Sequence, residues 1–267
     1  MKALKTKLVI LLFSLLGITN TAQAFLFPTS NGTIYDTFLS IEWMMDANLF
    51  KTLCDANDPL ATGFTPIDTA DANTICTNNN GAMTWNDAEA WIARLNANNY
   101  LGHNDWRQPK TLQPDTSCES LTPARNGAPE QWSGYNCRGS EMPHLFGGLI
   151  PLFSGGLSNW NHAGTGTTFG PDGERGTIGN GCAAYMVSNC LTNTESFENL
   201  QASAYWSGTE QAGYPGFVWM FSFYYGGQEN GFEKNDLNVP LYVLPVRDEP
   251  LIPRTKKPSN FIDSLIQ

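Results

Sequence analysis

The stretch that decides the fold is "TWNDAEAWIARLN", residues 84–96. Thr84 is a good helix N-cap, and Asp87 stands three residues later. There its carboxylate can accept a hydrogen bond from the backbone N–H of the cap residue and interact favourably with the positive end of the helix dipole. Four apolar residues recur at helical spacing and are expected to face the core together: Trp85, Ala88, Ile92 and Leu95. The stretch therefore predicts an amphipathic helix in which the carboxylate of Asp87 serves its own backbone.

The tripeptide Trp85-Asn86-Asp87 also allows a second interpretation, as part of a site that holds calcium and a sugar. In C-type lectins, which the tripeptide resembles, a Glu-Pro-Asn or Gln-Pro-Asp loop comes first and Trp-Asn-Asp follows on a later strand. Here Gln113-Pro114-Asp115 follows the tripeptide, and the tripeptide lies in the predicted helix. The reversed order disfavours a calcium site, so we predict no cofactor and keep calcium as a minor alternative.

Residues 1–24 have the three parts of a secretory signal peptide. Three lysines form a basic region, residues 8–16 form an apolar run too short to span a bilayer, and Ala22-Gln23-Ala24 is a cleavage site of the small-x-small kind. We expect one domain over residues 25–248 and a Pro-rich tail over 249–267; an uncleaved anchor is the minority alternative. No later segment is apolar enough to cross a membrane, which predicts a secreted, periplasmic or surface protein.

The chain is acidic, with 15 Lys and Arg against 25 Asp and Glu and a formal net charge of −10. Three of the basic residues and none of the acidic ones lie in residues 1–24, so removal of that segment changes the charge to −13. Such a surface repels polyanions, which disfavours nucleic acid, anionic membranes and sulfated polysaccharides as partners. Acidity of this kind also keeps a secreted protein soluble.

All six cysteines follow the predicted signal segment, and an even number in an exported chain favours disulfide bonds over metal binding or catalysis. Each neighbouring pair lies within one loop rich in Gly, Asn or Pro. We therefore expect the bonds Cys54–Cys76, Cys118–Cys137 and Cys182–Cys190, each stabilising its loop by about 2–4 kcal/mol.

Regular stretches alternate with long loops. Residues 33–45 are typical of a strand, and residues 46–82 form a polar stretch that we expect to be a loop. Residues 204–248 predict a meander of strands, since four aromatic residues occupy alternate positions: Phe217, Trp219, Phe221 and Phe223. Gly226-Gly227 is expected to make a turn within it.

Five motifs in order resemble the bacterial Lcl C-terminal-like domain: "TWNDAEAWIARLN", "YLGHNDWRQP", "GSEMPHLF", "NLQASAYWSGTE" and "VLPVRD". The resemblance implies an α+β, C-type-lectin-like fold in which two helices flank a twisted, mainly antiparallel sheet with long loops. It also implies N- and C-terminal strands that lie close together and a second helix that begins near residues 139–150. The long loops match no motif.

Other residues of these motifs are predicted to be architectural. Trp106, Trp206 and Trp219 lie in strand-like runs and are expected in the core, with the indole N–H bonded to a backbone carbonyl. Arg107 and Arg247 stand beside apolar residues and need carboxylate partners. Three acidic residues are candidates for that role: Asp87, Glu89 and Glu210. An arginine clamp for an anionic ligand is the weaker alternative.

The candidate binding region is the Gly-, Asn- and Thr-rich segment 154–199. Loops of this length are usually functional or disordered. Amide side chains and flat aromatic faces suit a neutral saccharide. The candidate ligand residues are Trp160, Asn161, Asp172, Glu174, Asn180 and Tyr185. Asp172, Glu174 and Asn180 could surround calcium, but they lack the spacing of an EF-hand loop.

Catalysis is disfavoured. The three histidines, His103, His144 and His162, have no metal-ligand spacing, and the chain contains neither a G-x-S-x-G elbow nor a P-loop. A formylglycine-generating type of chemistry requires a special cysteine, whereas every cysteine here has a loop partner. A pair of carboxylates could still hydrolyse a glycoside. We therefore predict a non-catalytic domain that binds a glycan or surface partner, with a structural or assembly component as the first alternative and an enzyme as the second.

Overall fold

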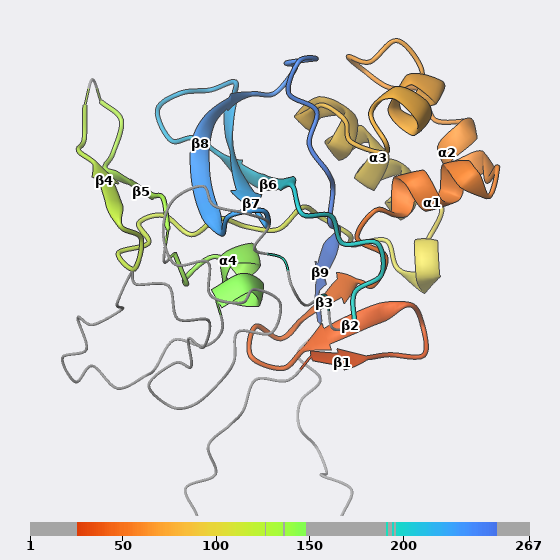
Figure 1. Ribbon diagram of the computed structural model, residues 1–267, viewed down its shortest axis with the longest axis horizontal. Helices are drawn as coiled ribbons and strands as arrows, with labels where there is room; N and C mark the ends of the chain where they lie inside the picture. Colours follow the sequence, from red (N-terminus) through yellow and green to blue (C-terminus); the bar gives the residue numbers. More distant parts are fainter. Residues whose placement is uncertain are drawn as a thin grey trace, which may run out of the picture.

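The computed structural model describes residues 26–125, 127–135, 137–147, 191, 194 and 196–249, which form a mixed α+β fold with antiparallel sheets (Figure 1). The strands are β1 (Leu26–Pro28), β2 (Thr33–Asp36), β3 (Ile41–Met44), β4 (Ser120–Thr122), β5 (Gln131–Ser133), β6 (Ala204–Glu210), β7 (Phe217–Ser222), β8 (Gly227–Glu233) and β9 (Val246–Asp248). The helices are α1 (Leu49–Asp55), α2 (Pro59–Thr62), the π-helical turn η1 (Thr74–Asn78), α3 (Trp85–Ala97), the 3₁₀ turn η2 (Tyr100–Gly102) and α4 (Glu141–Gly147).

One sheet has the strand order β1-β2-β3-β9 and brings the two ends of the described chain together. Its register places Leu26 opposite Asp36 and Ile41 opposite both Asp36 and Asp248. The stretch predicted as one strand, residues 33–45, is thus a hairpin, since a turn separates β2 from β3. The N- and C-terminal strands therefore share one sheet, as the resemblance implies, although β1 and β9 lie at its opposite edges and β9 pairs with β3.

Helix α3 confirms the prediction made from residues 84–96. The N–H of Asp87 donates to Oγ1 of Thr84 at 3.1 Å, which is the expected N-cap bond. The core-facing side chains are Ala88, Trp91, Ile92 and Leu95, while Trp85 is half-buried against the core. Of the two tryptophans in the helix, Trp91 is therefore buried more deeply than Trp85.

The prediction of a polar loop over residues 46–82 is wrong, because the segment contains α1, α2 and η1. Helix α2 begins with a capping Asp58 whose Oδ1 accepts from the N–H of Leu60 at 2.8 Å, followed by Pro59 at the first helical position. Apolar residues scattered among polar ones reach the core from these short helices: Leu49, Phe50, Leu53, Ala61, Phe64 and Ile75. The Cys54–Cys76 bond joins α1 to η1, as predicted.

The predicted Cys118–Cys137 bond is also present, and it closes a segment that contains the β4–β5 hairpin. Figure 1 shows this hairpin beside the sheet β6-β7-β8 and away from the helices α1 and α2. A bridge between Gly134 and Gln228 continues β5 onto β8, with N···O distances of 2.7 and 2.9 Å.

The predicted meander is confirmed as the antiparallel strands β6, β7 and β8. Trp106, Trp206 and Trp219 are all buried. The indole N–H of Trp206 donates to the carbonyl of Met83 at 2.8 Å, and that of Trp106 donates to the carbonyl of Tyr100 at 3.1 Å. These two bonds are of the kind expected for core tryptophans.

Both motif arginines have carboxylate partners, but the three candidates named from the sequence were wrong. Arg107 forms two 2.8 Å bonds with Glu141 and a further ion pair with Asp248. Arg247 contacts Asp105 at 2.9 and 3.2 Å and Glu42 at 2.9 Å. These pairs join β9 to β3 and to the residues after η2, and they join the residues after η2 to α4. Spacing along the sequence does not reveal them.

Within the described residues, no helix combines the length and the apolar character that crossing a bilayer would require.

Candidate functional site

The residues predicted to contact a ligand lie outside the described part of the chain. They are Trp160, Asn161, Asp172, Glu174, Asn180 and Tyr185. The predicted Cys182–Cys190 bond, the signal segment 1–24 and nearly all of the tail 249–267 lie outside it too. Those predictions stay as expectations, and the described residues offer other groupings of polar and aromatic side chains.

The carboxylate of Asp87 binds a neighbouring segment, so the prediction that it serves its own helix was wrong. Its Oδ1 accepts from the N–H groups of Ile67 and Asp68 at 2.6 and 2.9 Å. Its Oδ2 accepts from the N–H of Thr69 at 3.1 Å and from the hydroxyl of the same residue. Asp87 is fully buried. Four donors therefore surround both carboxylate oxygens, and this side chain is not directed at a ligand.

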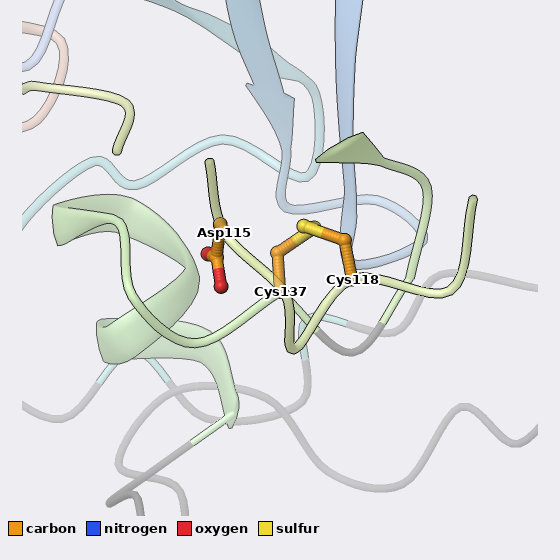
Figure 2. Close-up of side chains that lie close together, drawn as sticks. All are labelled: Asp115, Cys118 and Cys137. Atoms are coloured by element: carbon orange, nitrogen blue, oxygen red, sulfur yellow. A yellow bond between two sulfur atoms is a disulfide. The ribbon is translucent and has the colours of Figure 1, made fainter. Parts of the chain in front are cut away.

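Asp115 lies beside the Cys118–Cys137 bond (Figure 2), and the ligand atoms of these three residues lie within 4.8 Å of one another. Both sulfur atoms belong to the disulfide, and metals bind the thiolate form of cysteine. Oδ1 of Asp115 accepts from the N–H and hydroxyl of Ser117, and Oδ2 accepts from the N–H of Gly139 at 2.9 Å. The grouping therefore organises backbone around the bridge.

The amide of Gln113 has a similar task in the same motif. Its Nε2 donates to the carbonyl of Trp132 at 2.8 Å, and its Oε1 accepts from the N–H of Trp132 at 2.8 Å. Gln113 thus binds the backbone inside the segment that the bridge closes, and Asp115 binds Ser117 and Gly139 on either side of that segment. The Gln113-Pro114-Asp115 motif holds the β4–β5 hairpin in place.

A charged grouping lies between α3 and β6. Gln108 donates to Glu89 at 2.7 Å, and Lys234 forms a 2.6 Å bond with Glu210 while standing 4.6 Å above the ring of Trp85. Burial raises the pKa of Glu89 above its ordinary value, while the bond from Gln108 and the charge of Lys234 act in the opposite direction. Lys234 covers one face of the Trp85 ring, so this face already has a partner within the protein.

Exposed aromatic rings gather where β5 faces the turn between β7 and β8. Tyr135 and Tyr225 lie edge to face with ring centroids 6.1 Å apart, and Tyr224 lies 6.4 Å from Tyr225. Tyr224 is 41% exposed, and the other two rings are partly exposed. The hydroxyl of Tyr225 donates to Oε1 of Glu229 at 2.8 Å. We call Tyr135, Tyr224 and Tyr225, together with the neighbouring Glu229, the three-tyrosine surface.

The backbone of the turn at Gly226 and Gly227 places Tyr224 and Tyr225 at the surface. Gly226 has a φ of +74°, and a Cβ there would stand 2.2 Å from the ring of Phe146 on α4. A Cβ at Gly227 would stand 2.5 Å from the ring of Tyr225. Only glycines fit this turn, which is the one predicted at Gly226-Gly227. The turn keeps the Tyr224-Tyr225 pair at the surface while the next strand pairs with β7.

Buried amides brace the strand beneath the three-tyrosine surface. Oε1 of Gln131 accepts from Gln211 at 2.9 Å and from Asn230 at 2.6 Å, and its Nε2 donates to the carbonyl of Ala212 at 3.2 Å. Gln131 is 3% exposed, so these bonds form in a poorly hydrated setting, where they are strongest. They fix β5 against β8 and thereby fix the distance between the tyrosines.

Burial and the bond to Glu229 raise the pKa of Tyr225 above its ordinary value, so the phenol keeps its proton at neutral pH. The surface therefore offers flat aromatic faces, phenol groups and one carboxylate. These tyrosines are not among the site residues predicted from the sequence. The signal for them was the pair of tyrosines directly before Gly226-Gly227, because residues that flank a tight turn are commonly exposed.

Comparison of the chain with protein-family models, with curated proteins and with solved structures gave no match.

Proposed function

We propose that the protein is an exported, disulfide-stapled binding domain with a C-type-lectin-like fold of the Lcl C-terminal kind, which binds a neutral glycan or a cell-surface partner without catalysis. The disulfide bonds Cys54–Cys76 and Cys118–Cys137 support export, because such bonds persist in oxidising compartments. The five sequence motifs and the α+β, antiparallel architecture support the fold assignment.

The three-tyrosine surface carries the proposal that a glycan is bound. A saccharide presents C–H faces that stack on aromatic rings and hydroxyls that need hydrogen-bond partners. Tyr224 offers an exposed ring, and Glu229 offers a carboxylate acceptor next to Tyr225. The formal net charge of −10 favours an uncharged ligand over a polyanion. The loop residues predicted from the sequence, Trp160 and Tyr185 among them, lie outside the described residues and stay separate candidates for ligand contact.

A glycan array followed by calorimetry on the best ligand tests the proposal. Replacing one stacking ring costs about 1–1.5 kcal/mol, so Tyr224→Ala should weaken binding about tenfold. Tyr214→Ala is the matched control, since Tyr214 is 38% exposed and lies in the β6–β7 connection. Equal affinity of both variants and the wild type would move glycan binding away from this surface. A parallel array with a chelator tests the calcium alternative.

The competing role is a structural or assembly component that binds no small ligand. Aromatic surfaces rich in tyrosine also occur at protein interfaces. Self-association that is lost in Tyr224→Ala, together with an array that gives no signal, would favour that role. Activity on a panel of glycosides, lost on replacing one carboxylate, would favour an enzyme instead.

A further inference from the structure

An open cavity of about 570 Å³ at the surface is lined by residues of α1, α2 and η1 and of the segments beside them. This volume falls within the range of roughly 300–1,000 Å³ that is usual for small-molecule sites. The Cys54–Cys76 bond and Ala72 contribute apolar lining. Because the disulfide joins α1 to η1, two sides of the cavity are covalently fixed relative to each other.

One wall of the cavity is a π-helical turn, a rare structure that occurs frequently at functional sites. In η1 the N–H of Asn79 donates to the carbonyl of Thr74 at 3.1 Å, a bond that spans five residues. The turn brings the largely buried Cys76 and the exposed Thr77 to the cavity, and Asn73 lines it just before the turn. A π-helical turn on a functional wall is the first indication of a ligand site.

The polar groups on the cavity have unused hydrogen-bonding capacity. Among the described residues, no side-chain hydrogen bond engages the amide of Asn57 or that of Asn73. The hydroxyl of Thr77 donates to the carbonyl of Asn73 at 2.7 Å, and that of Thr62 donates to the carbonyl of Asp58 at 3.0 Å. Each hydroxyl therefore keeps lone pairs that can accept a bond from a ligand.

The charges on the cavity cancel. Lys51 and Asp55 form an ion pair one helical turn apart at its edge, and among the described residues no other charged side chain lines it. The cavity therefore presents little net charge to attract a charged ligand, and a neutral ligand leaves the ion pair intact. Free amides and hydroxyls beside an apolar floor suit a molecule with many hydroxyls and a hydrocarbon face.

We infer that the cavity between α1, α2 and η1 is a second ligand site, for a neutral polyhydroxylated molecule the size of a monosaccharide. Asn57 and Asn73 bind the hydroxyls of the ligand, and Ala72 and the disulfide contact its C–H face. The site is independent of the three-tyrosine surface, since the two share no residue. A ligand of this size bound by few groups should have a dissociation constant on the order of millimolar.

Amide chemical shifts of the isotope-labelled full chain, titrated with glucose, galactose and N-acetylglucosamine, test the inference. With at least one of these sugars, we expect saturable shifts at Asn57, Asn73 and Thr77. The double variant Asn57→Gly/Asn73→Ala should bind that sugar at least tenfold more weakly. Gly preserves the backbone at position 57, where φ is +54°. Asn235→Ala, at an exposed position away from the cavity, is the matched control and should bind as the wild type does.

The outcomes separate this site from the three-tyrosine surface. Tyr224→Ala should leave the shifts at Asn73 and Thr77 unchanged; loss of those shifts in Tyr224→Ala would overturn the inference. So would the absence of saturable shifts with all three sugars, or unchanged affinity in the double variant. If the double variant fails to fold, Thr77→Val replaces it, and the titration of the wild type remains decisive.

Discussion

The two disulfide-closed segments of the structure have similar lengths but are held in different ways. Cys54–Cys76 spans 22 residues and Cys118–Cys137 spans 19. The first segment buries apolar side chains, Phe64 and Ile75 among them, in the main core. In the second, all three residues of β4 are exposed, and the hairpin is held mainly by polar contacts: those of Gln113, the Gly134–Gln228 backbone bridge and the amide bonds of Gln131.

The difference shows that covalent closure and packing are separate sources of order. The first segment has a disulfide, a share of the core and the buried carboxylate of Asp87. The second has a disulfide and a set of hydrogen bonds, with little apolar burial. We therefore expect the first segment to unfold with the whole molecule and the second to open by itself.

Asp87→Ala should have the largest effect, because it removes the carboxylate that anchors the first segment. Three backbone N–H groups and one hydroxyl would lose their acceptor, and we expect a loss of about 4 kcal/mol in the free energy of unfolding. Urea denaturation followed by tryptophan fluorescence measures it. Asp71→Ala is the control: its exposed carboxylate caps Thr74, and the expected loss is about 1 kcal/mol. Equal losses in both variants would contradict this account of Asp87.

Removing the two disulfides separately should give the next largest effects. Cys54→Ala/Cys76→Ala should lower the free energy of unfolding by about 3 kcal/mol through chain entropy, while residues 55–75 stay protected by packing. Cys118→Ala/Cys137→Ala should cost about 1–2 kcal/mol, because a hairpin that opens by itself regains entropy in the native state. Hydrogen exchange read by mass spectrometry should show fast exchange at residues 119–135 in the second variant only. Fast exchange in both closed segments of both variants would remove the distinction.

Mild acid should have the smallest effect, acting through α4, which follows the second segment. His144 is 6% exposed and stacks on Phe38, its Nε2 lies 3.7 Å from Asp36, and among the described residues its Nδ1 has no hydrogen-bond partner. Burial lowers the pKa of His144, and the nearby charge of Asp36 offsets this in part. The unfolded imidazole takes up a proton below about pH 6.5 and the native one resists it, so stability falls as the pH drops below that value.

Melting temperatures at about pH 7 and pH 5 measure this loss, the two values lying on either side of the ordinary histidine pKa. His144→Phe keeps the stack with Phe38 but cannot take up a proton, so its melting temperature should fall less between the two values. His103→Phe is the control, since His103 is only partly buried beside Trp106. An equal fall in the wild type and His144→Phe would show that other groups cause the acid sensitivity.

The sequence allowed prediction where a local pattern coincides with a local structure. Helix α3, the strands of the meander, the turn at Gly226-Gly227 and two disulfide bonds follow from cap residues, alternation and loop-closing cysteines. Each of these depends on residues close together in the chain. The burial of Trp106 and Trp206 likewise follows from their strand-like neighbours.

The sequence did not allow prediction where the structure depends on contacts between distant residues. Asp87 was assigned to its own helix because the cap position is local, whereas Ile67 and Thr69 reach it from about 20 positions away. The partners of Arg107 and Arg247 lie up to 205 positions away. The short helices of residues 46–82 escaped notice because their apolar residues are few, although Asp58-Pro59 marked the start of one. The three-tyrosine surface forms because the chain after β5 pairs with β8. The alternation of apolar and polar residues within single strands does not reveal that pairing.

The register of the sheet β1-β2-β3-β9 also determines how the molecule would respond to mechanical load. Leu26, Asp36, Ile41 and Asp248 lie in one row across it, so residues 26 and 248 are at the same end of the sheet, three strand spacings or about 14 Å apart. Tension applied between these two residues would peel neighbouring strands apart one hydrogen-bonded pair at a time. The domain should therefore unfold at low force when it is pulled through residues 26 and 248. Because both residues lie at the same end of the sheet, segments of chain joined to them would extend from the same side of the domain.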